Sequence, residues 1–176
     1  ARHRGARIVH IDPYRNETSR FADEHWQIAV GTDAALALAL GGEILRLGLE
    51  DADFLRRFAN SLDDYRAACQ AWPIARAADY CGLSPDQLTE LARAIGETRA
   101  TFFKVGYGMS RNEGGGNAIR AVTLLPALTG AWQHAGGGAA LSTSGAFYLN
   151  KQRYSGLHLL KPGRRHINQN QLGHAL

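Results

Sequence analysis

Cysteine is scarce in this sequence, and so are the motifs that bind metals. Cys69 and Cys81 are the two cysteines among 176 residues, and they are not spaced as C-x-x-C. Both fall in helical patterns, where we expect buried thiols. A disulfide scaffold and a zinc or iron–sulfur site built by this chain alone are therefore disfavoured. The seven histidines form no H-E-x-x-H motif, so we predict no metal ligand.

Long apolar runs and familiar catalytic motifs are also lacking. No run of about 18 apolar residues occurs, so we predict no membrane span. Without a G-x-S-x-G elbow or a recognisable Ser/His/Asp set, we predict no catalytic residue in this chain. Residues 1–5 are typical of the end of a helix with its C-terminal glycine, which indicates an internal piece of a longer protein. A signal upstream would then decide between a periplasmic and a cytoplasmic location.

The net charge of +4 comes from 20 basic and 16 acidic residues, and the basic excess gathers at the two ends. The basic residues concerned are Arg2, Arg4, Arg7, Lys151, Arg153, Lys161, Arg164 and Arg165. They lie in segments without periodicity rather than on one element interleaved with aromatic residues, as in a nucleic-acid binder. We therefore expect solvated loops or an anionic small ligand, and no nucleic acid.

The apolar pattern predicts an α/β fold. β-Branched runs indicate strands at residues 7–12, around 25–30 and at 100–105. An almost wholly apolar helix follows Asp33, which we expect to be its N-cap, and another helix is expected at about 117–132. This order favours a layered arrangement of strands and helices.

Two domains are expected from the change in pattern after the last glycine cluster. Residues 1–138 would form a parallel sheet flanked by helices. Residues 139–176 are mostly irregular and would be the start of an adjoining domain or an extended arm, with a helix near their end. Too few apolar residues recur there for an independent core.

Two acidic residues stand where neighbouring elements of the predicted sheet end or begin. Asp12 closes the first strand, and Asp33 opens the first helix. The carboxyl edge of an open α/β sheet is where nucleotides bind, and a carboxylate there can accept two hydrogen bonds from vicinal hydroxyls or a purine edge. Arg15, Thr18 and Thr32 suit phosphate oxygens. The alternative is that both acids only cap a turn and a helix, and spacing alone leaves the two interpretations open.

A glycine-rich stretch at 106–116 joins the third strand to a helix. Backbone N–H groups converge on an anion in this kind of connection. The spacing of Gly106, Gly108 and Gly114 is not that of G-x-G-x-x-G, and no Gly-Lys-Ser/Thr follows. A flexible connection without a ligand explains the composition equally well. Met109 would be a core residue or a cover over a planar ring.

Five separated motifs resemble the molybdopterin-guanine-dinucleotide oxidoreductases of the dimethyl sulfoxide reductase, formate dehydrogenase and nitrate reductase type. They cover nearly the whole chain, in order, with Ser19 and Val30 in place of the usual alanine and proline. The matching segments are Asp12-Pro13-Tyr14-Arg15-Asn16-Glu17-Thr18-Ser19 with Ala22-Asp23, Gly31-Thr32-Asp33-Ala34-Ala35-Leu36, Gly106-Tyr107-Gly108-Met109-Ser110-Arg111, Leu128-Thr129-Gly130 with Gly136-Gly137-Gly138, and Ile167-Asn168-Gln169-Asn170-Gln171-Leu172-Gly173.

The resemblance implies a Rossmann-like domain that lacks its first strand and helix and binds one pterin-guanine dinucleotide of a bis-molybdopterin guanine dinucleotide cofactor. It implies two-electron or oxygen-atom transfer at molybdenum or tungsten in the full-length protein, while this piece alone would be inactive. An iron–sulfur cluster, the remaining domains and an electron-transfer subunit would lie outside it. The implied cofactor-binding residues are Asp12, Pro13, Arg15, Thr18, Gly31, Thr32, Asp33, Gly106, Gly108, Met109, Ser110 and Arg111.

Two other functions stay open on the sequence alone. One is an NAD(P)-type dehydrogenase domain, which the missing G-x-G-x-x-G disfavours. The other is a structural module of a respiratory complex that keeps the fold without the cofactor.

Overall fold

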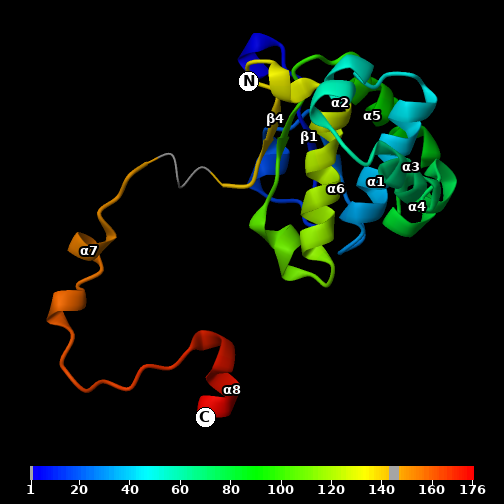
Figure 1. The fold of residues 1–176 in the computed structure, drawn as a ribbon. Helices are drawn as coiled ribbons and strands as arrows, with labels where there is room; N and C mark the ends of the chain where they lie inside the picture. Colours follow the sequence, from blue (N-terminus) through cyan, green and yellow to red (C-terminus); the bar gives the residue numbers. More distant parts are fainter. Residues whose placement is uncertain (1, 143–146) are drawn as a thin grey trace. The chain divides into compact units, whose positions relative to one another are not determined.

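The computed structural model describes residues 2–142 and 147–176 (Figure 1). The chain divides into two units, the first of which ends at Ser142. The α-helices and strands of the first unit are β1 (Val9–Ile11), β2 (Glu24–Trp26), α1 (Asp33–Arg46), α2 (Ala52–Phe58), α3 (Leu62–Gln70), α4 (Ile74–Cys81), α5 (Pro85–Glu97), β3 (Phe102–Lys104), α6 (Gly115–Leu128) and β4 (Gly138–Ala140).

The strands form two separate parallel pairs, β1 with β2 and β3 with β4. In the described residues no hydrogen-bonded ladder joins these pairs. The α/β class is thus confirmed, but the single Rossmann-like sheet expected from the sequence is not present in this part of the chain. Strand β4 begins at Gly138, and the first unit extends to Ser142.

Helix α1 lies at the centre of the first unit and contacts α3, α4, α5 and α6. Figure 1 shows α1 beside α6, which also contacts β3 and β4. Ile44, Leu88 and Leu125 are fully buried between these helices. Both cysteines are buried as free thiols, as expected. Gly41 lets α1 approach α3 closely, because a Cβ atom there would overlap the Tyr65 hydroxyl.

Local capping signals determine several helix ends. Ser84 and Gln87 form a capping box at the start of α5, as the pattern Ser-Pro-x-Gln predicts. Two expectations about helix ends, the start of α1 and the end of α6, are wrong. Thr32 is the N-cap of α1, and Asp33 is its first helical residue. Helix α6 ends at Leu128 instead of near 132, because Gly130 adopts a left-handed conformation with φ of 66° and a short 3-10 turn follows.

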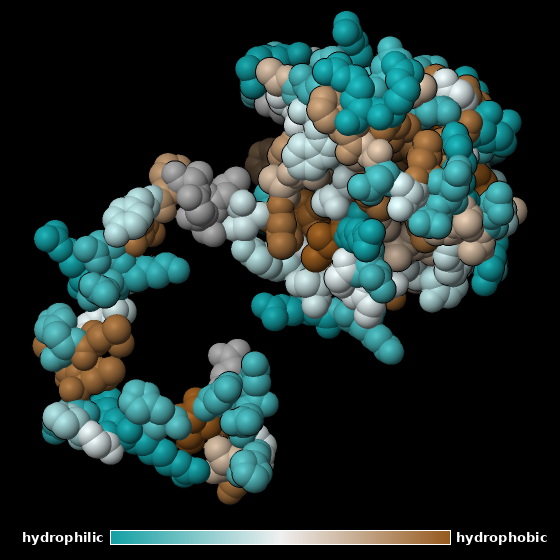
Figure 2. All heavy atoms as spheres, in the orientation of Figure 1, coloured by the Kyte–Doolittle hydropathy of each residue, from teal (hydrophilic) through white to brown (hydrophobic). Residues whose placement is uncertain are grey.

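The second unit has little regular structure. Within 147–176 the α-helices are the short α7 (Lys151–Tyr154) and α8 (Leu172–Ala175), and the described side chains are exposed or half-buried. Figure 2 shows apolar and polar side chains next to one another along this segment. The large apolar side chains exposed there include those of Phe147, Tyr148, Leu149, Tyr154, Leu157, Leu159 and Leu172. This segment therefore has no core of its own.

No helix in the described ranges combines the length and the hydrophobicity that a membrane span needs.

Candidate functional site

Asp12 stands at the carboxyl end of β1. Its backbone N–H extends the ladder to β2 by donating to the Trp26 carbonyl oxygen at 3.1 Å. One carboxylate oxygen accepts from the backbone N–H of Tyr14 at 2.7 Å, and the other from Nδ2 of Asn16 at 3.4 Å. The side chain stays 34% exposed. Asp12 thus does cap its own turn, and it keeps acceptor capacity toward solvent.

The loop after Asp12 carries three more of the predicted residues. Pro13 is half-buried, whereas Arg15 and Thr18 are exposed. The backbone N–H of Thr18 donates to Oδ1 of Asn16 at 2.8 Å, at the start of the 3-10 helix η2 (Glu17–Arg20). The Arg15 guanidinium forms no hydrogen bond or ion pair with the described part of the chain. It is therefore available to an anion.

Gly31, Thr32 and Asp33 form a turn that is anchored from below. Gly31 is exposed and has φ of 80°, a conformation that favours glycine. Thr32 is buried, and its hydroxyl donates to the Ala29 carbonyl oxygen at 2.7 Å. Below the turn, the Cys81 thiol donates to the Thr32 carbonyl oxygen at 3.7 Å. Thr32 therefore stabilises the turn, and its hydroxyl hydrogen is already used.

The Asp33 carboxyl is in an unfavourable place for a negative charge. Burial raises its pKa, a hydrogen bond from its own backbone N–H lowers it, and the charge of Asp12 raises it further. Asp12 and Asp33 thus act on each other electrostatically. Such a pair is stabilised by a ligand that donates hydrogen bonds to the carboxylates.

The glycine-rich stretch lies at the carboxyl end of β3 and contains the 3-10 helix η3 (Tyr107–Arg111). Ser110 donates through its hydroxyl to the Tyr107 carbonyl oxygen at 2.8 Å. Gly106 and Gly108 are open, because a Cβ atom on either would meet nothing within 4 Å. The outer side of this loop therefore has room for a ligand.

Met109, Ser110 and Arg111 take different positions in this loop. Met109 is half-buried, and Ser110 and Arg111 are exposed. The inner side is tightly packed, because a Cβ atom on Gly115 would overlap the Met109 carbonyl oxygen. The start of α6 thus supports the loop directly.

The two motifs meet at Gly31. A Cβ atom built on Gly31 would lie 4.0 Å from the Cβ atom of Asn112, which follows η3. Asn112 is held in turn, since its Nδ2 donates to the Gly108 carbonyl oxygen at 3.3 Å. Segments about 80 positions apart in the sequence thus form one surface. Sequence reasoning missed Asn112, because asparagine in a glycine-rich loop is ordinary turn chemistry.

Sequence reasoning also missed the partners that hold Asp12. The motif after Asp12 contains Asn16 and Ser19, but the sequence does not indicate that Asn16 donates to Asp12 or that His10 and His25 contact it. His10 on β1 and His25 on β2 lie beside Asp12, and Ser19 on η2 contacts the His10 ring. Their roles depend on strand register, which no local signal in the sequence gives.

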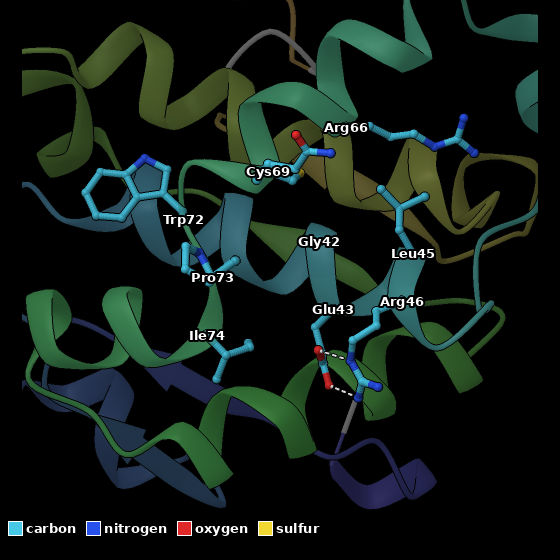
Figure 3. Close-up of a pocket in the computed structure, with 11 residues that line it drawn as sticks. Gly42, Glu43, Leu45, Arg46, Arg66, Cys69, Trp72, Pro73 and Ile74 are labelled. Carbon is cyan, nitrogen blue, oxygen red and sulfur yellow. Dashed lines mark hydrogen bonds and ion pairs between the residues drawn. The ribbon is translucent and has the colours of Figure 1, made fainter.

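Two hollows of the first unit lie away from the predicted site residues. A hollow of about 530 Å³ between α1, α3 and the start of α4 is lined by Trp72, Ile74, Arg66 and the ion pair of Glu43 with Arg46 (Figure 3). A second, of about 300 Å³, lies beside α2 and the start of α3. Neither is lined by a predicted site residue.

In residues 2–142 and 147–176, no three His, Cys, Asp or Glu side chains are grouped so that they could hold a metal ion. Burial raises the pKa of the Cys81 thiol, which keeps it protonated. The chemistry that this surface offers is hydrogen bonding and charge.

Comparison with known proteins gives consistent matches. A family model described as molybdopterin oxidoreductase matches residues 1–174. The probable oxidoreductase YoaE of Bacillus subtilis is 36% identical over all of this chain and 26% of its own length. The dimethyl sulfoxide reductase DmsA of Haemophilus influenzae is 32% identical over 71% of this chain and 18% of its own. Formate dehydrogenase H of Escherichia coli is 29% identical over 74% of this chain and 18% of its own length.

A solved structure supports the fold. Acetylene hydratase from Pelobacter acetylenicus superposes with a TM-score of 0.69 at 23% identity, covering 73% of this chain and 18% of that one. The chain spans about a quarter or less of the length of all these relatives.

Proposed function

This chain belongs to the molybdopterin oxidoreductase family, and we propose that it forms one wall of the cofactor site in a longer molybdenum or tungsten enzyme. In this proposal it binds the guanosine end of one pterin dinucleotide of a bis-molybdopterin guanine dinucleotide. The enzyme would perform two-electron or oxygen-atom transfer. No residue of this chain would carry out the chemical step.

The observation that carries the proposal is the convergence of the Gly31–Asp33 turn with Asp12 and the loop around Asn112. The residues fit a guanosine. Asp12 keeps free acceptor positions, and the edge of guanine offers an N–H and an amino group that a carboxylate can accept together. Asp33 can accept from the ribose hydroxyls, which would relieve the unfavourable burial of its charge.

The exposed residues beside the two acids suit the phosphates. The Arg15 guanidinium, which has no partner among the described residues, can hold a diphosphate oxygen, and the Thr18 hydroxyl lies on the same loop. Arg111 lies on the exposed side of η3 and would serve the same charge from the opposite segment. Thr32 would act through the shape of the turn, and Pro13 would fix the exit of the chain from β1.

The open glycine loop would face the pterin. Gly106 and Gly108 leave room for a planar ring to approach the backbone, and Ser110 can donate or accept at its edge. Met109 would lie against the ring as a polarisable apolar contact. When bound, the pterin–metal group supplies the two-electron chemistry, and this chain orients it.

We further propose that a strand from another part of the longer protein completes a Rossmann-like sheet. It would lie between the β1–β2 and β3–β4 pairs, which are parallel and unconnected in the described structure. The segment 147–176 would pack on adjoining domains, because its exposed apolar side chains need cover. An iron–sulfur cluster and an electron-transfer subunit would belong to those other parts.

The test uses the full-length protein. Metal analysis should find molybdenum or tungsten, and acid hydrolysis should release guanine nucleotide. The apoprotein should bind GDP in preference to ADP, and Asp12→Ala should weaken GDP binding by roughly tenfold to a hundredfold, as expected when hydrogen bonds to a charged group are lost. Asp53→Ala is the matched control, because Asp53 is exposed on α2 and pairs with Arg56 away from the site.

Equal loss of GDP and ADP in Asp12→Ala would assign Asp12 to the ribose instead of the base. Unchanged binding in both Asp12→Ala and Asp33→Ala would refute the site. Absence of both metal and nucleotide from the intact protein would favour the structural module without cofactor.

A further inference from the structure

Lys104 ends strand β3 and ties it to β4 at the carboxyl end of the pair. Its ammonium group donates to the carbonyl oxygen of Leu141 at 2.7 Å and to that of Val105 at 3.1 Å. The parallel register places Ala140 of β4 opposite Lys104. Because alanine is small, it leaves room for the lysine side chain to reach the Leu141 carbonyl oxygen. Lys104 thus fixes the point at which the chain leaves β3 for the glycine-rich stretch.

The positive charge of Lys104 is not neutralised by a carboxylate among residues 2–142 and 147–176, since it forms no ion pair there. Both of its acceptors are uncharged carbonyl oxygens. An ammonium group has three N–H donors, so one donor remains for a further partner. Lys104 is also exposed, so a ligand can reach it.

The open part of the glycine-rich stretch begins two residues after Lys104. A Cβ atom on Gly106 or Gly108 would meet nothing within 4 Å, so a ligand can approach the backbone there. Farther along, the stretch meets the turn at Gly31 through Asn112. A dinucleotide that extends from this turn along the stretch toward Gly106 would therefore come close to Lys104.

We propose that Lys104 is a further cofactor-binding residue, which holds an oxygen of the diphosphate that joins guanosine to pterin. This inference rests on the proposed function. An ammonium group is a compact point charge that suits a phosphate oxygen. The charged residues of the segment 104–116 are Lys104, Arg111 and Glu113, so the net charge of this segment is positive. The sequence alone does not indicate this role, because a single lysine at the end of a strand forms no motif.

The experiment measures binding of GDP, ADP and guanosine to the full-length apoprotein at about pH 8, where the phosphates carry their full charge. Lys104→Met keeps an unbranched side chain but removes the charge and the donors. We expect it to bind GDP and ADP more weakly by the same factor, roughly tenfold, as when a hydrogen bond to a charged group is lost. Guanosine has no phosphate, and its affinity should not change.

Arg99→Met is the matched control. Arg99 is exposed and precedes the same strand at its opposite end, so this variant removes one positive charge from the amino end of β3. It should bind all three probes like the wild type.

Lys104→Gln separates the charge from the contact with the carbonyl oxygens. Its amide can still donate to a carbonyl oxygen but carries no charge. The GDP affinity of the wild type should fall more steeply with sodium chloride concentration than that of Lys104→Gln, because salt screens the attraction between charges. This comparison decides the question even if Lys104→Met fails to fold.

Unchanged GDP affinity and salt dependence in Lys104→Gln would overturn the inference and leave the guanosine site intact, provided that the wild type prefers GDP to ADP. A loss of guanosine affinity equal to the loss of GDP affinity would also overturn it, since Lys104 would then only support the loop. Equal binding of GDP and ADP by the wild type, or binding of neither, would overturn both proposals.

Discussion

Gly115 and Gly116 offer a test of how the glycine loop is supported. Both are in the first turn of α6, and both would be replaced by alanine. A Cβ atom on Gly115 would overlap the Met109 carbonyl oxygen and lie 2.8 Å from the Ser110 Cα atom. These are backbone atoms, which cannot rotate away, so residues 109 and 110 would have to shift. A Cβ atom on Gly116 would meet nothing within 4 Å.

The two substitutions should change the free energy of unfolding in opposite directions. Alanine in a helix is more stable than glycine by about 0.5–1 kcal/mol, so Gly116→Ala should stabilise the protein by about that amount. Gly115→Ala has the same intrinsic gain, but forcing a methyl group into a packed contact costs about 1–3 kcal/mol. The unfolding free energies of the two variants should therefore differ by about 1–3 kcal/mol, with Gly115→Ala the less stable.

Urea unfolding of the two variants measures this difference, and GDP and cofactor content show whether the loop has moved. We expect Gly116→Ala to retain cofactor and Gly115→Ala to retain less of it. If the two variants unfold at the same urea concentration with the same slope, the close contact between α6 and the loop is not present in solution. If Gly115→Ala is less stable but keeps its full cofactor content, the loop does not face the cofactor.

Three further outcomes are expected. Asp51→Ala should destabilise the protein by about 1–2 kcal/mol in urea unfolding, because Asp51 caps α2 through the Phe54 N–H at 2.8 Å and accepts from Gln133 Nε2 at 2.7 Å; an unchanged midpoint would contradict this. Leu88→Ala should cost about 2–5 kcal/mol, since Leu88 is fully buried, and a smaller loss would mean that the core collapses around the cavity. Asp33→Asn should raise Tm at pH 7 and lower GDP affinity. Because the pKa of Asp33 is raised, its carboxyl contributes favourably to stability at acidic pH, and this contribution is lost as the pH rises. The gain in Tm from Asp33→Asn should therefore vanish near pH 3, where the wild-type carboxyl is protonated as well. A gain in Tm that is constant with pH would refute the unfavourable burial of the Asp33 charge.

Elements with local signals were predictable. The capping box at Ser84, the cap at Asp51 and the strand that ends just before Asp12 all depend on residues within a few positions of one another. Strand β4 was missed because its residues, Gly138–Ala140, have low strand propensity, and it exists through pairing with β3. The N-cap of α1 was placed one residue late, since Thr32 and Asp33 are both favourable capping residues.

The candidate site shows the same division. Its motif residues stand out in the sequence because glycines, acids and hydroxyls occur there at fixed spacing. The contact between Gly31 and Asn112 and the pairing of His10 with His25 were not predictable, since they depend on how the elements pack and on strand register.

By itself, the sequence determined the α/β class and the resemblance to one family, and it predicts which residues would meet a nucleotide, because these depend on residue type and short spacing. The tertiary structure decided which of these residues lie together, how exposed they are and which hydrogen bonds they form. It half-buried Asp33 near the charge of Asp12, used the Thr32 hydroxyl within the turn and set two histidines around Asp12. Charge burial, hydrogen-bond competition and strand register are properties of the packed fold, and short-range sequence patterns do not contain them.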